Sequence, residues 1–384
     1  MKIALYTYAR VFAEKQTGGQ KRFKELYKRL TAKYDVTLYS IDDQNTKELN
    51  GRKHIVIKQV PVKQLSLLPA DFRVYFKNRE LLKQIREEKY DKIIVFDVTS
   101  GWPLFAAHIE NIQLFIRQDL ISYKSISLDS ANKSWLYKRF YLQMMKMAES
   151  TCLKGADKIV VQCKYDLECL VRRHKNIERI IADKTVIQIN NVNPSWIKQQ
   201  PTTIMDRQSK NKGRDAFYLG FVGSPDDTRK GFHIFEGALE KLIQDGYSIG
   251  AYIIGNSRKI EEYRNKYKDN YRISFVGWSN NPLEYLDQCD LAVVPSLADS
   301  CPNTVIEPLN AGIPVIGCYA GGIPELINDE DALFEPNTDS LAKLVAKLID
   351  HPDELSSIVD KQQIRKKELE FDWAQKVSEL VGIL

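Results

Sequence analysis

The sequence lacks the features of a membrane-spanning or secreted protein. Among its 384 residues there is no run of 18 apolar residues, which excludes a helix that spans a bilayer. The first twelve residues, MKIALYTYARVF, contain a short apolar stretch after one Lys, and no small-residue cleavage site follows. We therefore expect a buried first strand there and no signal peptide.

Cysteine and histidine are scarce. The six cysteines form no CxxC pair, and with only five histidines no Cys/His cluster has the spacing of a metal site. In a lysine-rich chain of this length we expect reduced thiols and a cytoplasmic location.

The composition is that of a folded protein with unevenly distributed charge. Hydrophobic residues make up 43% and charged residues 28%, which excludes wholesale disorder, and the length fits two domains of about 150–200 residues. Residues 1–200 carry 36 Lys+Arg against 21 Asp+Glu, a balance of +15, whereas residues 201–384 carry 20 against 29, a balance of −9. The net charge of +6 therefore arises in the N-terminal half alone.

Short β-branched runs alternate with longer amphipathic segments, which predicts parallel sheets covered by helices. In the first half we expect strands at 3–7, 36–40, 54–58, 92–96, 112–116, 158–161 and 185–189, and helices at 19–33, 72–88, 134–154 and 164–173. A polar linker is expected at 198–215. Further strands are expected at 216–222, 250–254, 272–276, 291–295 and 314–317, and final helices at 340–350, 353–369 and 372–384. Ligands of two such sheets bind in the loops at the carboxyl ends of the strands.

The strongest functional signal is the stretch from Pro295 to Ile327, PSLADSCPNTVIEPLNAGIPVIGCYAGGIPELI. We expect a helix to start near Thr304, with Glu307 in its first turn, and the amides of such a turn favour an anionic ligand such as a diphosphate. Asp299 stands eight residues before Glu307, and two carboxylates beside one pocket suit recognition of vicinal hydroxyl groups. The residues alone are equally consistent with Asp299 as a turn residue and Glu307 as a favourable charge at a helix start.

The same stretch resembles the signature region of the GT-B glycosyltransferases, specifically the large retaining family 4 (group 1). The family's E-x7-E motif occurs as Asp299-x7-Glu307, followed by the family-like segments Ala311–Ile316 and Gly321–Glu325, and the resemblance covers nearly the whole chain in order. It implies that Glu307 binds the ribose hydroxyls of a nucleotide and that Asp299, one methylene shorter than the family's Glu, acts near the transferred sugar. It also implies that one loop binds the sugar hydroxyls and the phosphate. The residues of this loop are Ser300, Cys301, Pro302, Asn303 and Thr304.

A second signal lies at Phe221–Ser224 and continues to Arg229 and Lys230. Gly223 follows a strand, where a glycine lets the backbone approach a ligand closely. Two cations at the same cleft would stabilise the charge that develops on a departing nucleoside diphosphate, without a metal. The family places an Arg and a Lys of this loop on the donor phosphates. Lys230 matches the Lys, whereas Ser224 stands at the usual Arg position, so either Arg229 substitutes for that Arg or the phosphate contact is weaker.

Other positions give weaker signals. Gly18 and Gly19 resemble the family's loop toward the donor diphosphate, or form an ordinary turn. Trp278 follows a strand and either stacks on the nucleotide base or packs in a core. Gln118 occupies the place of a His that faces the reaction centre in many members.

One acidic triplet matches a metal-binding signature of the other large glycosyltransferase fold. Asp329-Glu330-Asp331 has the DxD pattern, but its position before a short strand predicts a solvated turn. We therefore expect no metal.

Basic and aromatic residues alternate around two segments of the N-terminal half. No nucleic-acid motif accompanies the charge, so nucleic-acid binding is not expected. The pattern suits an anionic membrane surface, at about 1 kcal/mol per Lys or Arg, or an ordinary solvated helix face. The aromatic members are Phe23, Tyr27, Phe72, Tyr75 and Phe76.

The resemblance implies an α/β protein of the GT-B fold, with two Rossmann-like domains whose parallel sheets face each other across a cleft. Residues 1–197 would bind the acceptor, residues 198–368 the nucleotide-sugar, and residues 369–384 would form a helix that crosses back to the first domain. The implied activity is retaining, metal-independent hexosyl transfer, with a UDP-sugar favoured as donor and co-substrate and with no cofactor. The acceptor would be a glycan, a glycolipid or a protein-linked group in the synthesis of cell-surface polysaccharide or glycoconjugates.

The location implied is the cytoplasm or the inner face of the cell membrane. The alternatives are a catalytically silent GT-B partner subunit of a glycosyltransferase complex and a sugar-nucleotide epimerase of the same fold.

Overall fold

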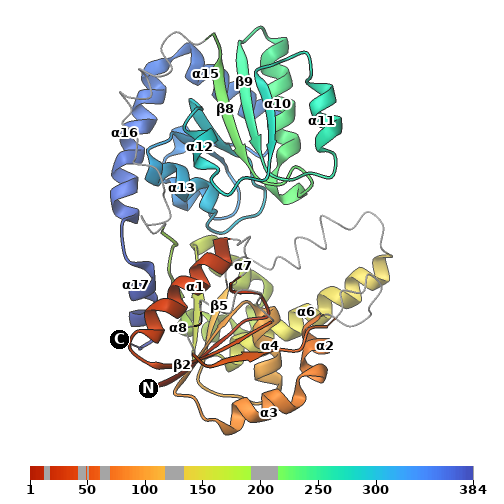
Figure 1. The fold of residues 1–384 in the computed structure, drawn as a ribbon, viewed down its shortest axis with the longest axis vertical. Coiled ribbons are helices and arrows are strands. Elements are labelled where there is room, and N and C mark those ends of the chain that lie inside the picture. Colours follow the sequence, from red (N-terminus) through yellow and green to blue (C-terminus); the bar gives the residue numbers. More distant parts are fainter. Residues whose placement is uncertain are drawn as a thin grey trace. The chain divides into compact units, whose positions relative to one another are not determined.

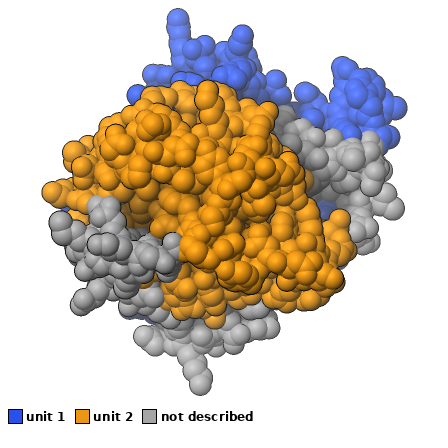
Figure 2. Space-filling model, turned by 90° about the horizontal axis from the view of Figure 1, so that it is seen from above, with its two compact units in different colours: residues 1–189, 372–384 blue, residues 190–371 orange. Residues whose placement is uncertain are grey.

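The protein consists of two compact units (Figures 1 and 2). The computed structural model describes residues 1–12, 18–41, 49, 52–60, 70–116, 134–191 and 215–383. Unit 1 comprises Met1–Ile189 and Asp372–Leu384, and unit 2 comprises Asn190–Phe371.

Unit 1 is built on a seven-stranded parallel sheet of order β3-β2-β1-β4-β5-β6-β7. The strands are β1 (Lys2–Tyr6), β2 (Asp35–Ser40), β3 (His54–Val56), β4 (Lys92–Phe96), β5 (Ile112–Ile116), β6 (Lys158–Val161) and β7 (Thr185–Ile187). The helices are α1 (Gly18–Thr31), α2 (Ala70–Lys77), α3 (Arg79–Glu87), α4 (Val98–Ala106), α6 (Trp135–Gly155), α7 (Lys164–Arg173), α8 (Glu178–Lys184) and α17 (Trp373–Leu380).

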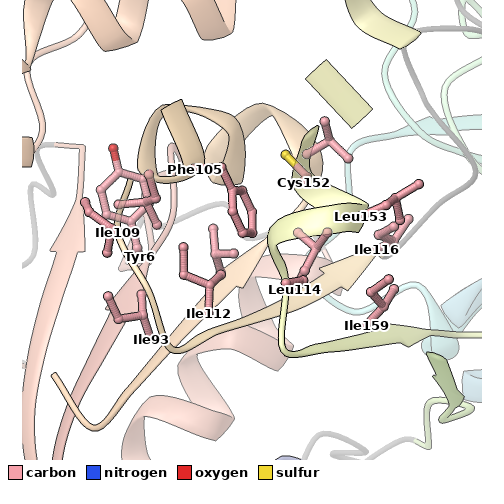
Figure 3. Packing of buried hydrophobic residues seen from close by; sticks show 14 of the residues in the cluster. Tyr6, Ile93, Phe105, Ile109, Ile112, Leu114, Ile116, Cys152, Leu153 and Ile159 are labelled. Carbon is pink, nitrogen blue, oxygen red and sulfur yellow. The ribbon is translucent and has the colours of Figure 1, made fainter. Parts of the chain in front are cut away.

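The core of unit 1 lies between this sheet and its helices. All five residues of β5 are buried, as expected for a parallel strand with helices on both faces. Figure 3 shows Phe105 of α4 and Leu153 of α6 above Ile112 and Leu114 of β5. This packing fixes α4 and the C-terminal half of α6 on the sheet.

Helix α17 packs against α1 in unit 1. Its Trp373 is buried, and the guanidinium of Arg22 lies 5.3 Å from the indole ring. The Arg29 guanidinium pairs with Asp372 at 2.9 Å. These contacts attach the end of the described chain to its first helix.

Unit 2 is built on a six-stranded parallel sheet of order β10-β9-β8-β11-β12-β13. The strands are β8 (Phe217–Val222), β9 (Ile249–Ile254), β10 (Ile273–Gly277), β11 (Leu291–Val294), β12 (Val315–Cys318) and β13 (Leu333–Phe334). The helices are α10 (Phe232–Gln244), α11 (Ile260–Lys266), α12 (Leu283–Leu286), α13 (Asn303–Ala311), α14 (Ile323–Ile327), α15 (Thr338–Asp350) and α16 (Pro352–Leu369). The two parallel sheets confirm the predicted α/β fold class.

The helix predicted at 72–88 is two helices, because the chain breaks at Asn78. This residue is buried, and its amide group accepts a hydrogen bond from the Lys58 N–H at 2.8 Å and donates one to the Lys58 carbonyl at 3.0 Å. These side-chain bonds to a neighbouring segment compete with the helix, and α3 begins at the next residue.

Two properties expected from the composition can be compared with this structure. Within the described ranges, no helix is both long and apolar enough to cross a membrane. All six cysteines are described, and each is a buried free thiol.

Candidate functional site

Two loops of unit 2 meet where β8 and β11 lie side by side. The Leu297 N–H, in the loop after β11, donates a hydrogen bond to the Arg229 carbonyl, in the loop after β8, at 2.7 Å. Gly231 has φ +67°, and a Cβ atom there would lie 1.9 Å from the Pro295 carbonyl oxygen, so a glycine is required. The strand order reverses between β8 and β11, and ligands of parallel sheets bind at such a reversal.

The two loops are also joined by an ion pair between two of the predicted catalytic residues. The Lys230 Nζ lies 2.8 Å from the Asp299 Oδ2. The Asp299 side chain is 7% exposed and that of Lys230 is 26% exposed. Charges that are partly withdrawn from water interact more strongly than surface charges. The structure therefore brings these residues together at the carboxyl end of the sheet.

Arg229, the third predicted catalytic residue, is engaged within its own loop. Its Nε and Nη2 atoms donate hydrogen bonds to the Asp227 carboxylate at 3.0 and 2.7 Å. Burial raises the pKa of Asp227, but the Arg229 hydrogen bonds and charge outweigh it and hold the pKa below its ordinary value. Asp227 stands two residues before Arg229, and this spacing is the sequence signal that could have identified the pair.

A second carboxylate, that of Asp226, fixes the loop after β8 to the segment after β9. Asp226 accepts hydrogen bonds from the Ser257 hydroxyl and the Arg258 N–H, both at 2.7 Å, in the segment after β9. These bonds, the Arg258 backbone bond first, lower the pKa of Asp226. The loop that carries Lys230 is thus held on both sides.

The backbone of Asp299 is shaped by the glycine turn after β12. The Gly322 N–H donates to the Asp299 carbonyl at 2.9 Å. Gly321 has φ +61°, and a Cβ atom there would lie 2.1 Å from the same carbonyl oxygen. Gly321 thus permits an approach to Asp299 that a larger residue would prevent.

Helix α13 begins directly after the Asp299 loop. No side chain caps its N-terminus, and the Thr304 hydroxyl oxygen is buried without a hydrogen-bond partner in the described chain. The helix starts at Asn303, so Glu307 is its fifth residue and lies in the second turn. The prediction of Glu307 in the first turn was wrong, because the extended Pro302 starts the helix earlier than expected. Glu307 is half-buried.

The remaining residues predicted in this loop are also placed. Ser300, Cys301 and Pro302 are buried, whereas Asn303 and Thr304 are half-buried at the start of α13.

Asn256 connects the segments that follow β8 and β10. Its carbonyl accepts a hydrogen bond from the Ser224 hydroxyl at 2.8 Å, and its side-chain oxygen accepts one from the Trp278 N–H at 3.1 Å. The Gly223 N–H donates to the Ile254 carbonyl at 2.9 Å and so continues the pairing of β8 with β9. Trp278 is 46% exposed, which excludes the core-packing alternative.

The family comparison matches the part of the chain that holds these loops. Residues 216–351 match the family model described as "Glycosyl transferases group 1". An uncharacterized glycosyltransferase of Methanocaldococcus jannaschii is 23% identical over 265 residues, which are 65% of this chain and 61% of that protein. The chain therefore aligns with less than two thirds of this relative's length.

The structural comparison covers both units. Sucrose-phosphate synthase from Thermosynechococcus elongatus superposes with a TM-score of 0.74 at 19% identity, over 99% of this chain and 98% of that one. HepE from Anabaena, in complex with UDP and glucose, superposes with a TM-score of 0.71 at 17% identity, over 100% and 99%. The chain therefore has the GT-B fold, and residues 216–351 match the group 1 glycosyltransferase model.

In this GT-B protein the remaining predicted binding residues belong to unit 1. Gly18 and Gly19 are the first two residues of α1. Gln118 lies outside the described residues.

The α1 segment of the GT-B protein does not present the aromatic face that its sequence suggests. Phe23 and Tyr27 are buried, and they make edge contacts with Phe96 at 4.9 Å and with Phe12 at 5.7 Å between ring centroids. The aromatics of α1 therefore belong to the core and not to a membrane face.

Two carboxylates of the acidic triplet form ion pairs with a lysine. The Lys361 Nζ lies 2.9 Å from Asp329 Oδ1 and 2.6 Å from Asp331 Oδ2. The hydrogen bond from Lys361 lowers the pKa of Asp331. Among the described residues, no group of three His, Cys, Asp or Glu side chains is arranged to hold a metal ion.

Proposed function

We propose that the protein is a retaining glycosyltransferase that moves a hexosyl group from a UDP-sugar to a glycan, glycolipid or protein-linked acceptor, in the synthesis of cell-surface polysaccharide or glycoconjugates. The observation that carries the proposal is the Lys230–Asp299 pair at the strand-order reversal of a group 1 domain. UDP is favoured as the nucleotide because the structural neighbour HepE holds UDP and glucose.

Helix α13 supplies the donor diphosphate site in this proposal. The uncapped N-terminus of a nine-residue helix favours an anion, and the buried Thr304 hydroxyl would donate to a phosphate oxygen. Glu307 would accept hydrogen bonds from the ribose hydroxyls, and the exposed Trp278 would stack on the base.

Lys230 and Asp299 divide the chemistry of transfer in this proposal. The bond between the sugar and the diphosphate breaks, and its electron pair leaves with the diphosphate, whose added charge the Lys230 ammonium stabilises. The acceptor hydroxyl bonds to the sugar on the same face and passes its proton to the departing phosphate oxygen. Asp299 would accept hydrogen bonds from sugar hydroxyls. Lys230 and the α13 amides carry the charge stabilisation, so the proposal needs no metal and no cofactor.

The proposal places the acceptor mainly on unit 1. It also places the protein in the cytoplasm, in peripheral contact with the inner face of the cell membrane, where a lipid-linked acceptor would lie.

A panel of UDP-, GDP- and TDP-sugars tests the donor and the activity together. Thermal shift measures binding, and release of free nucleotide, with and without EDTA, measures turnover. We expect UDP-sugars to stabilise the protein and to release UDP equally with and without the chelator. If no nucleotide-sugar binds, the proposal is overturned. If nucleotide-sugars bind, but neither nucleotide release nor transfer to any glycan or lipid acceptor tested is detected, the silent partner subunit is supported instead.

A further inference from the structure

Helix α6 exposes four large apolar side chains. Trp135, Leu136, Phe140 and Met147 are each more than half exposed to solvent. The spacing of Leu136, Phe140 and Met147 by four and seven residues places them on one side of the helix. A cluster of exposed apolar residues of this size marks an interaction surface. We call these four residues the α6 face.

Among the described residues, the buried side chains of the helix lie in its C-terminal half. None of its first ten residues, Trp135–Met144, is buried, whereas Met145, Ala148 and Glu149 are. The Glu149 carboxylate accepts a hydrogen bond from the Arg173 Nε at 2.7 Å and lies 2.6 Å from the His174 Nε2. Glu149 thus fixes the C-terminal half of α6 to α7, whereas Trp135, Leu136 and Phe140 in the N-terminal half are exposed.

The charge of this helix identifies the occupant of the face. Lys138, Arg139 and Lys146 are interspersed with the apolar residues, and no Asp or Glu occurs between Ser134 and Ala148. The Arg139 guanidinium lies 5.4 Å from the Trp135 ring, so cation and aromatic are presented together. A basic helix with Trp, Leu and Phe on its apolar side is the composition of a helix that lies in the interface of an anionic membrane.

The charge also argues against a second copy of this chain. Two copies of α6 packed face to face would bring like charges together. Unit 1 as a whole carries 36 Lys+Arg against 23 Asp+Glu, a balance of +13, so another unit 1 is an unfavourable partner and an anionic surface is a favourable one.

We propose that the α6 face is the surface by which the protein binds an anionic lipid bilayer, with Trp135, Leu136, Phe140 and Met147 inserted at the level of the headgroups and Arg139 and Lys146 on the lipid phosphates. The inference rests on the peripheral membrane contact included in the proposed function, and it moves that contact from the segments around α1 and α2 to α6. The reason at α1 is the burial of Phe23 and Tyr27 in the core. The reason at α2 is that Phe72 and Tyr75 pack against Trp102, which leaves Phe76 as the exposed aromatic residue there.

Vesicle flotation tests the inference without any sugar transfer. The full chain is mixed with phosphatidylcholine vesicles, with or without about 30 mol% phosphatidylglycerol, and the bound fraction is measured at low and high salt. We expect binding to the anionic vesicles only, weakened by salt because surface charges are screened. Failure of the chain to bind anionic vesicles overturns the inference and leaves the donor panel unaffected.

Two variants locate the surface. Leu136→Ser/Phe140→Ser/Met147→Ser removes apolar area, and Arg139→Glu/Lys146→Glu reverses charge, both at positions outside the core. Each is expected to lower the vesicle partition coefficient by about tenfold or more. The matched control is Phe76→Ser/Arg79→Glu, which changes an exposed aromatic residue of α2 and the basic residue of α3 beside it. It is expected to bind as the wild type does.

The contrary outcomes are specific. Equal loss in the control and the α6 variants would show that general charge or the basic segment around α2 carries binding, and it overturns the inference. The inference is also overturned if light scattering finds a wild-type dimer, the triple serine variant is a monomer, and this variant still binds vesicles.

Discussion

The ammonium group of Lys230 pairs with a carboxylate that water scarcely reaches. Removing it leaves the Asp299 carboxylate, 7% exposed, without this partner, and an unpaired charge that is shielded from water destabilises the fold. We predict that Lys230→Ala lowers the free energy of unfolding by about 1–3 kcal/mol. It also lowers turnover by about 10²–10³, because charge stabilisation of the leaving group is lost. Urea unfolding and nucleotide release measure the two effects.

A surface pair in the same unit provides the control for Lys230. Lys241 pairs with Asp339, but both side chains are well exposed. Lys241→Ala is expected to change neither stability nor turnover measurably, since exposed pairs contribute little. Equal unfolding curves for the two alanine variants would contradict the interpretation of the Lys230–Asp299 pair.

Replacing Gly321 or Gly246 with alanine distinguishes the cost of backbone strain from the cost of a steric clash. Both have positive φ, +61° and +90°, but a Cβ atom meets the Asp299 carbonyl at 2.1 Å only at Gly321, whereas nothing lies within 4 Å at Gly246. We predict that Gly246→Ala costs about 1 kcal/mol for backbone strain alone, and that Gly321→Ala costs about 1–3 kcal/mol more. Gly321→Ala should also weaken the binding of UDP, measured by calorimetry, because Asp299 and its loop must shift. Equal stability and affinity in the two variants would contradict this role of Gly321.

At the scale of elements, weakening the packing of α17 should destabilise unit 1 and leave unit 2 unchanged. Trp373 is buried against unit 1, so Trp373→Ala leaves a cavity there. We predict a loss of about 3–5 kcal/mol in the stability of unit 1, with UDP affinity of unit 2 unchanged. Hydrogen exchange of β1 to β7 compared with β8 to β13 measures the difference, and the exposed Lys376→Ala on the same helix is the control. Equal loss of protection in both sheets would contradict the division.

Sequence patterns predicted the elements better than their ends. The bounds of β5 and β6 were predicted without error, because a largely apolar run of only four or five residues between polar residues favours a buried strand over a helix. The break at Asn78 was not predictable, since it depends on the bonds of its side chain to Lys58, which is distant in sequence. Helix propensity is local, and tertiary contacts override it.

The candidate site shows the same limit at finer detail. The residues Lys230 and Asp299 were selected from two separate motifs, but their pairing 69 residues apart in sequence is information that only the fold supplies. Arg229 was expected to face a ligand, whereas its guanidinium is held by Asp227, a neighbour that composition and motif did not single out. The roles of these residues in catalysis stay predictions.

At the scale of the whole molecule, a nucleotide should stabilise one unit more than the other. A ligand at a hundredfold excess over its dissociation constant adds about 2.7 kcal/mol to the stability of the unit that binds it. We predict that UDP raises the hydrogen-exchange protection of the β8–β13 sheet by this amount and leaves the core strands of unit 1 unchanged. A matched rise in both sheets, or in unit 1 alone, would contradict the assignment of the donor to unit 2.

The return of α17 to unit 1 has a consequence for the order in which the protein is made. Residues 372–383 leave the ribosome after all of unit 2, yet Trp373 is part of the packing of α1, one of the first helices synthesised. During translation the strands and helices of the second unit are therefore synthesised before the helix that covers α1 of the first. Chains released early, within or after unit 2, would expose the surface of α1 that α17 covers, and so would be the ones most open to chaperone binding or to proteolysis.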